Sequence, residues 1–353
     1  MSQIRRVFFL FSLAVVIGTF TIGAVARGTA NVSLSVDKQA FASGEAVRVT
    51  VTISNPERGS IRLLKWYTPA DDVEESLFRV TRDGVPVEFI GPHYKRPEPT
   101  DRDFIVLKSG ESLVRNIDLA DYHDLSVTGA YSVAYDVKSL DLYGKNDAAM
   151  ARVQDLNSNG LQVWIEGRAA KRPEAQAPSA VSGASSYTKC TTTQQSQGAA
   201  ARNEASTYAS DSLTYLMAGF DQQGLRYATW FGAKTTTRYN KVSSNFTNIK
   251  GAMDTASVNF NCGCKKQYYA YVYPNQPYNI YLCRIYWTAP LTGTDSKAGT
   301  LIHEMSHFTI VAGTDDWVYG QSGARNLATT NPDHAVDNAD SHEYFAENTP
   351  FQP

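Results

Sequence analysis

HEMSHF at residues 303–308, followed by GTDDWVYG at residues 313–320, decides the fold of the sequence around it. Residues four apart lie on one face of a helix, so His303 and His307 can direct their ring nitrogens at one metal ion. Glu304 lies one position further round, where a carboxylate can reach a metal-bound water without binding the metal. This spacing predicts a catalytic zinc site in which Glu304 is the general base.

Apolar residues at helical spacing predict a helix through this stretch, at Ala298, Leu301, Ile302, Met305 and Phe308. We expect Thr294 or Asp295 to cap its start and Gly313 to end it in a left-handed turn.

A catalytic zinc needs a third protein ligand and one open position. The metzincin pattern would place a glycine at Ile310 and a histidine at Gly313, so the sequence excludes that class. Glu343, on a later segment, could nominally serve as it would in thermolysin-like enzymes. Asp316 is the better candidate, because a Gly-Thr reversal after the helix can bring it back under the same metal.

Three motifs together carry a family resemblance: HEMSHF, GTDDWVYG and NADSHEYFAENTP at residues 338–350. They resemble the aspzincins, the deuterolysin family, and most closely its peptidyl-Lys metalloendopeptidase branch, over roughly residues 187–353. The resemblance implies a secreted zinc endopeptidase that acts on proteins and peptides. It implies these site residues: His303, His307 and Asp316 as zinc ligands, Glu304 as general base, and Tyr319 as a phenol that stabilises the oxyanion.

Two acids near the carboxyl end bear on specificity. Asp340 and Glu343 stand three apart in a predicted short helix over residues 338–348, so both can face one pocket. The residues alone favour a solvated helix face, and the nearby acids Asp333, Asp337 and Glu347 leave a calcium site open. The resemblance implies instead that the pair holds a lysine ammonium, with arginine fitting less well, so that cleavage falls on the amino side of lysine.

All four cysteines lie between Cys190 and Cys283, and an even count in an exported chain suggests disulfides. Cys262 and Cys264 are poorly placed to bond each other, which leaves two pairings. The resemblance selects Cys190 with Cys262 and Cys264 with Cys283. A second metal site at the cysteines would lack the usual ligand spacing.

Composition is that of a two-domain chain with 42% hydrophobic residues and a net charge of −2, which argues against nucleic-acid or anionic-membrane partners. Arg5 and Arg6 precede an apolar run over residues 7–22, and small residues at Ala24 and Ala26 fit a secretory cleavage site. We expect a signal peptide over residues 1–26, with an uncleaved membrane anchor as the alternative, and a monomer with no stable membrane association.

The segment 27–166 alternates apolar and polar residues in many short runs without intervening helices, and Asp83-Gly84 is typical of a hairpin turn. We expect an antiparallel, immunoglobulin-like β-sandwich. By resemblance this is a propeptide that inhibits the enzyme or assists its folding; an attached binding module is the alternative.

Residues 167–186 are rich in Ala, Pro and Ser and predict an exposed linker, in which Lys171 offers a self-processing site after Ala170. The propeptide has no cysteine to act on the zinc; His93 or an acid could reach it, and steric cover by the whole domain is equally open.

The catalytic half, residues 187–353, should be mainly α-helical, as an α+β zincin domain with a small antiparallel sheet. We expect a long helix over residues 194–217, a second helical stretch through Trp230 and Tyr239, and a hairpin from residues 269–273 to residues 278–286. Substrate can pair along such an edge strand, although its tyrosines favour sheet packing. The remaining alternatives are a broader deuterolysin-like specificity, or a secreted adhesion protein with a structural metal.

Overall fold

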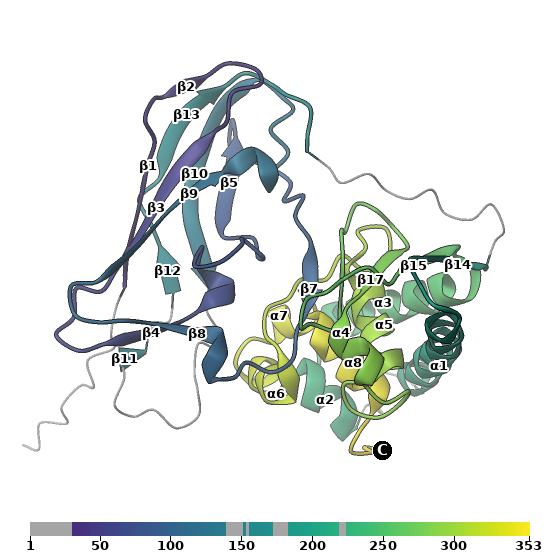
Figure 1. The fold of residues 1–353 in the computed structure, drawn as a ribbon. Coiled ribbons are helices and arrows are strands. Elements are labelled where there is room, and N and C mark those ends of the chain that lie inside the picture. Colours follow the sequence, from purple (N-terminus) through teal and green to yellow (C-terminus); the bar gives the residue numbers. More distant parts are fainter. Residues whose placement is uncertain (1–29, 139–150, 153–154, 172–182, 219–223) are drawn as a thin grey trace, which may run out of the picture.

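The computed structural model describes residues 30–138, 151–152, 155–171, 183–218 and 224–353. Residues 30–171 are built from strands and are called the amino-terminal half below; residues 183–353 contain the long helices and are called the carboxyl-terminal half. Figure 1 shows the two halves side by side, with strand β7 reaching from the first into the second. The predicted order, a β-rich region followed by a mainly helical one, is confirmed. The expected signal peptide lies outside the described residues.

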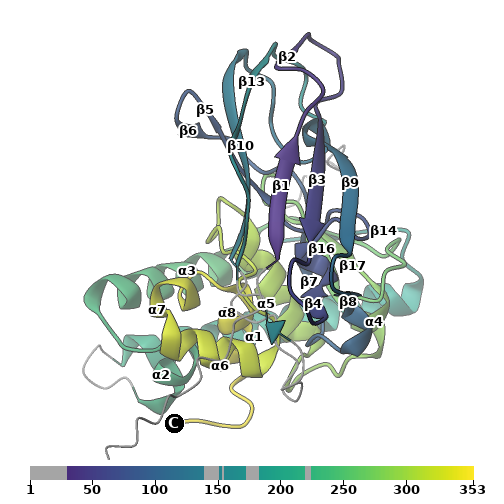
Figure 2. The ribbon, with the colours of Figure 1, turned by 90° about the vertical axis from the view of Figure 1, so that its left-hand side faces the viewer.

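Two sheets of the amino-terminal half face each other, as Figure 2 shows. One sheet has the order β1-β3-β9 and the other the order β2-β13-β10-β5-β6, with β12 paired to β10. Alternate residues of each sheet point inward, among them Val49 and Val51 of β3 and Tyr131 and Val133 of β10, all at most 1% exposed. The strands are β1 (Asn31–Ser35), β2 (Ala40–Phe41), β3 (Arg48–Ser54), β5 (Phe78–Arg82), β6 (Val85–Pro86), β9 (Ser112–Asp118), β10 (Gly129–Lys138), β12 (Asp155–Asn157) and β13 (Leu161–Ile165).

A third, smaller sheet extends this half towards the helices. It has the order β11-β4-β8 and comprises β4 (Ile61–Leu64), β8 (Phe104–Leu107) and β11 (Ala151–Arg152). Short 3-10 helices connect the strands: η1 (Lys65–Tyr67), η2 (Asp101–Asp103) and η3 (Leu119–Asp121). Most strand pairs of this half are antiparallel, as expected. Only the short pairs β2 with β13 and β4 with β11, among the described residues, are parallel.

The predicted turn at Asp83-Gly84 joins β5 to β6, with both residues at positive φ, 50° and 83°. After this turn only Val85–Pro86 joins the sheet. Further along, Phe89 forms an isolated bridge to His123. The chain then leaves the sandwich at Gly91-Pro92 and forms β7 (His93–Lys95).

The helices of the carboxyl-terminal half pack around α5, which contacts α1, α3 and α8. Small residues on one face of α1, Ala201, Ala205 and Ala209, are fully buried and allow this close packing. The stretch expected as one helix through Trp230 is two, because Gly232 at φ 72° ends the first where a Cβ would meet the Ala328 carbonyl at 1.9 Å. The helices are α1 (Thr192–Met217), α2 (Leu225–Phe231), α3 (Thr236–Thr255), α4 (Arg284–Thr288), α5 (Lys297–His307), α6 (Gly320–Thr330), α7 (Pro332–Ala335) and α8 (Ala339–Glu347).

The sheet of this half has five strands in the order β14-β15-β17-β16-β7. Its own strands are β14 (Ser185–Thr188), β15 (Val258–Asn261), β16 (Ala270–Val272) and β17 (Asn279–Leu282). The predicted hairpin is present as β16 and β17, but the sheet is mixed rather than antiparallel. Helices α1 to α3 connect β14 to β15, and a crossover of that length permits parallel pairing.

Two disulfides cross-link loops of this half. Cys190 is joined to Cys262 and Cys264 to Cys283, which is the pairing that the family resemblance implies. The first ties the loop after β14 to the end of β15, and the second ties the following loop to the start of α4. Among the described residues, no helix is both long and apolar enough to cross a membrane.

Candidate metal centre and acid pocket

Helix α5 is buried along its whole length, which places His303, Glu304 and His307 in the interior. Ser296 caps the helix, because its Oγ accepts a hydrogen bond from the Gly299 amide at 2.9 Å. The expected caps Thr294 and Asp295 are therefore wrong.

Asp295 lies at φ 52°, just before the helix, and its carboxylate accepts a hydrogen bond from the Tyr344 hydroxyl instead of capping. The helix ends earlier than expected, at His307, and the chain turns through Thr309 to Ala312 before Gly313 takes up its positive φ of 59°.

The turn after α5 brings Asp316 back to the two histidines. The Thr314 amide donates to the Ser306 carbonyl, and the Thr314 carbonyl lies 2.8 Å from His307 Nδ1. Asp316 Oδ1 then lies 3.3 Å from His303 Nε2, and its Oδ2 lies 3.4 Å from His307 Nε2. The two Nε2 atoms are 3.1 Å apart. We call His303, His307 and Asp316 the His–His–Asp cluster.

The spacing of this cluster fits zinc. Bonds of about 2.0–2.1 Å to a tetrahedral ion would place ligand atoms about 3.3 Å apart, close to the separations observed. The outer ring nitrogens have other neighbours: His303 Nδ1 lies 2.9 Å from Asp340 Oδ1, and His307 Nδ1 faces the Thr314 carbonyl. Such contacts fix the orientation of a metal-binding imidazole and leave its other nitrogen for the metal.

Glu304 lies beside the cluster without joining it. It is fully buried, and among the described residues neither of its carboxylate oxygens has a hydrogen-bond partner. Burial raises the pKa of Glu304 to about 7. A carboxyl group with a pKa near 7 that lies next to the His–His–Asp cluster has the properties of a general base.

The two acids near the carboxyl end are buried rather than solvated. Asp340 and Glu343 lie on α8, both 0% exposed, and with Asp295 they surround one ammonium group, that of Lys95 from β7. The Lys95 Nζ lies 3.2 Å from Asp295, 3.2 Å from Asp340 and 2.8 Å from Glu343. We call Asp295, Asp340 and Glu343 the acid pocket.

The neighbouring acids do not belong to this pocket. Asp333 pairs with Arg238 and Asp337 with Lys241, while Glu347 accepts from the Ser296 amide and hydroxyl. His303, Asp340 and Glu343 do have donor atoms within 4.8 Å of one another, as a second metal would require. In this structure the Lys95 ammonium lies among them.

Tyr319 lies at the start of α6 and is only 4% exposed. Its hydroxyl donates to Glu75 Oε1 at 2.7 Å and accepts from the buried guanidinium of Arg96. Its ring packs edge-on against Trp66 at 5.2 Å between centroids. In this structure the amino-terminal half therefore holds the phenol that sequence reasoning placed in the active site.

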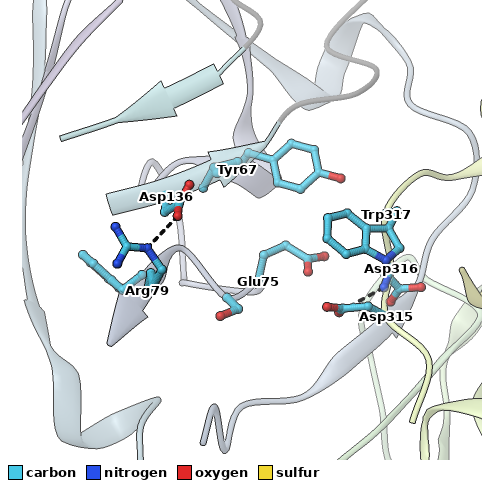
Figure 3. A pocket seen from close by; sticks show the side chains of 10 residues that line it. Tyr67, Glu75, Arg79, Asp136, Asp315, Asp316 and Trp317 are labelled. Carbon is cyan, nitrogen blue, oxygen red and sulfur yellow. Dashed lines mark hydrogen bonds and ion pairs between the residues drawn. The ribbon is translucent and has the colours of Figure 1, made fainter. Parts of the chain in front are cut away.

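A cavity of about 290 Å³ lies between the halves, next to the cluster. Figure 3 shows Tyr67 and Glu75 of the amino-terminal half on one side and Asp315, Asp316 and Trp317 on the other. The sequence alone did not predict a functional role for Glu75, Lys95, Arg96 or Asp295. For Lys95 and Arg96 the sequence does hold a signal, a basic pair between Pro92 and Pro97 near His93, but it does not mark Glu75 or Asp295.

Helix-borne histidines, a returning aspartate and a buried glutamate define a metal-dependent hydrolase of the HExxH class. The chain belongs to the aspzincin M35 family: its family model, described as lysine-specific metallo-endopeptidase, matches residues 216–347, and full-length relatives agree. This chain is thus a zinc metalloendopeptidase, as the resemblance implied.

Two relatives and one solved structure document the likeness. An extracellular protease of Aeromonas hydrophila is 47% identical over 88% of this chain and 90% of its own length. A peptidyl-Lys metalloendopeptidase of Armillaria mellea is 35% identical over 100% of both chains. A solved zinc peptidase from Grifola frondosa is 47% identical, with a TM-score of 0.45, and covers 46% of this chain and 100% of its own.

Asp316→Asn is expected to weaken zinc binding by at least about 100-fold, because a neutral amide replaces the anionic donor and even outer-shell changes cost about 10–100-fold. Zinc titration of the metal-stripped chain, competed against a chromogenic chelator, measures this. Asp315→Asn is the matched control, since its side chain is 52% accessible and lies one residue away. Equal zinc affinity in the two variants would remove Asp316 from the ligand set.

Proposed function

We propose that this chain is a secreted zymogen whose mature form cleaves peptide bonds on the amino side of lysine. The observation that carries the proposal is the acid pocket beside the His–His–Asp cluster: Asp340 Oδ1 lies 2.9 Å from His303 Nδ1 and 3.2 Å from a lysine ammonium. A lysine side chain bound in that pocket would hold its own peptide bond close to the cluster.

His303, His307 and Asp316 would hold the zinc, which, when bound, polarises a water and the substrate carbonyl. Glu304 accepts a proton from the attacking water as the new C–O bond forms. It then delivers that proton to the leaving amine as the C–N bond breaks. It is buried beside the cluster, and among the described residues neither of its carboxylate oxygens has a hydrogen-bond partner, so the carboxylate is available for both transfers.

Tyr319 follows Asp316 by three residues and would donate a hydrogen bond to the developing oxyanion. A phenol has an ordinary pKa of about 10, so the hydroxyl carries the proton that it must donate at neutral pH. In the zymogen this hydroxyl is engaged by Glu75 and Arg96, so the role requires that the amino-terminal half move away.

Specificity for lysine would follow from the negative charge of the acid pocket and from the burial of its carboxylates. Lys95, Asp340 and Glu343 are each 0% exposed, and buried carboxylates without a cation are costly. A neutral side chain would leave the charge of these carboxylates without a lysine cation, and the planar fork of arginine is bulkier than an ammonium. The rings of Tyr269 and Tyr344 lie 5.0 and 5.5 Å from the ammonium and favour a cation as well.

Processing would separate the halves at the linker. Lys171 is exposed, and its Nζ pairs with Asp121 at 2.6 Å and Asp118 at 3.1 Å, while residues 172–182 lie outside the described part. Such surface pairs contribute little stability, so they would not protect the Ala170–Lys171 bond. We propose that the mature chain begins after this region and acts as a monomer on protein and peptide substrates.

Glu304→Gln is expected to lower the rate of peptide hydrolysis by at least about 100-fold, because it removes the proton acceptor while keeping the shape of the side chain. Zinc content should remain one per chain, since Glu304 is not a ligand. Activity on a fluorogenic peptide and metal analysis of the same sample measure both. Near-normal turnover would assign the base elsewhere.

The processed protein should cut a denatured substrate almost only before lysine, and a chelator should abolish the cuts. Glu343→Gln should reduce the lysine preference by at least about 30-fold, because truncating one partner of a buried charge pair costs about 2 kcal/mol or more. Mass spectrometry of all new termini measures this. Chelator-sensitive cuts without lysine preference would instead indicate a broader, deuterolysin-like specificity.

Lys171→Ala should delay or shift the appearance of the mature amino terminus, because the proposed self-processing site loses its lysine. Amino-terminal sequencing of the secreted product over time measures this, with the exposed Lys108→Ala as control. An unchanged terminus and rate in the Lys171 variant would rule out this site.

A further inference from the structure

Strand β7 is flanked by prolines in the sequence. It lies in the stretch Gly91-Pro92-His93-Tyr94-Lys95-Arg96-Pro97, with a proline on each side. A proline restricts its own φ, and the residue before it is held in the extended region. The residues on either side of the strand, Pro92 and Arg96, are therefore restricted to conformations compatible with an extended chain.

This strand adds to the free edge of the carboxyl-terminal sheet. His93, Tyr94 and Lys95 face Val272, Tyr271 and Ala270 of β16 in antiparallel register, and the Tyr269 amide donates to the Lys95 carbonyl at 3.0 Å. Without β7, β16 would be an edge strand with unpaired backbone groups. An extended peptide that binds by strand addition makes the same contacts.

Alternation along β7 sends His93 and Lys95 to one face and Tyr94 to the other. Tyr94 packs against the rings of Tyr268 and Tyr271, at 5.3 and 5.1 Å between centroids. Lys95 enters the acid pocket and is fully buried there. Its ammonium neutralises the buried carboxylates of Asp340 and Glu343.

The residues on either side of Lys95 reach the catalytic groups. The His93 ring lies 4.9 Å from that of His307, and donor atoms of His93, His307 and Asp316 lie within 4.8 Å of one another. Arg96 donates to the hydroxyl of Tyr319. Residues 93–96 thus meet the pocket, the His–His–Asp cluster and the phenol.

We infer that residues 93–96 form an internal, substrate-mimicking inhibitor, in which Lys95 occupies the acid pocket as the lysine of a substrate and excludes external peptides. The inference rests on the proposed lysine specificity, and it adds that Lys95 occupies the acid pocket before processing. Removal of the amino-terminal half would expose β16, the acid pocket and Tyr319 in one step.

Binding of a peptide to the full chain tests this inference without turnover. The probe is a fluorescent peptide with one lysine, its partner has norleucine at that position, and both are titrated into the Glu304→Gln chain. Adding Lys95→Met to that chain should tighten the dissociation constant for the lysine peptide by at least about tenfold, with little change for the norleucine peptide. Lys108→Met, a substitution of an exposed lysine in the same half, should change neither.

A second measurement does not depend on the folding of a variant at Lys95. In the Glu304→Gln chain, an amine-acylating reagent should modify Lys108 readily and Lys95 slowly, because Lys95 is buried. Excess lysine peptide should increase the acylation of Lys95 severalfold by displacing it from the acid pocket, whereas the norleucine peptide should not. Mass spectrometry quantifies both sites.

Two results would overturn the inference. Equal affinity for the lysine peptide with and without the Lys95→Met substitution, together with no effect of that peptide on Lys95 acylation, would show that β7 does not compete with substrate. Rapid cleavage between Tyr94 and Lys95 in the zinc-loaded chain with Glu304 intact would make β7 a substrate rather than an inhibitor. Either result, with lysine preference retained by the processed protein, would leave the proposed specificity standing.

Discussion

Neutralisation of buried charge is the constraint on which the rest of this structure depends. Asp340 shows it most directly: its Oδ1 lies 2.9 Å from His303 Nδ1 and 3.2 Å from the Lys95 ammonium, and its Oδ2 accepts from the Gly320 amide at 2.7 Å. One carboxylate thus links the His–His–Asp cluster, the acid pocket and the start of the helix that follows Tyr319. Because each charge is buried, each needs its partner in place, and helices α5, α6 and α8 must meet with little freedom.

The same constraint joins the two halves of the chain. The carboxyl-terminal half supplies three carboxylates around one site, and the amino-terminal half supplies the ammonium that neutralises them. Glu75 and Arg96 make a second buried contact across the halves, at Tyr319. In the proposed function an external lysine would be bound by the same charges as Lys95, so the proposed specificity and the proposed latency would depend on one set of carboxylates.

Much of the site could be predicted from local sequence. The helix through His303 and His307, the return of Asp316 and the short helix with Asp340 and Glu343 all depend on spacings of at most nine residues within each motif. Buried apolar residues at helical positions and the left-handed Asn348 at the end of α8 agree with those predictions. The predicted helix cap was wrong because Ser296, not Asp295, accepts the hydrogen bond from the Gly299 amide. The Asp295 carboxylate instead accepts a hydrogen bond from Tyr344 and pairs with Lys95.

The contacts between the halves could not be predicted in this way. Lys95 and Asp340 are 245 residues apart, and the composition of neither segment predicts that it contacts the other. The addition of β7 to β16 depends on a free strand edge, which exists only once the sheet has formed. The most direct test is a crystal structure of the full-length, zinc-loaded Glu304→Gln chain with anomalous diffraction at the zinc edge. We predict one zinc peak between His303, His307 and Asp316 with Lys95 in the acid pocket; zinc bound elsewhere, or an acid pocket without Lys95, would contradict this account.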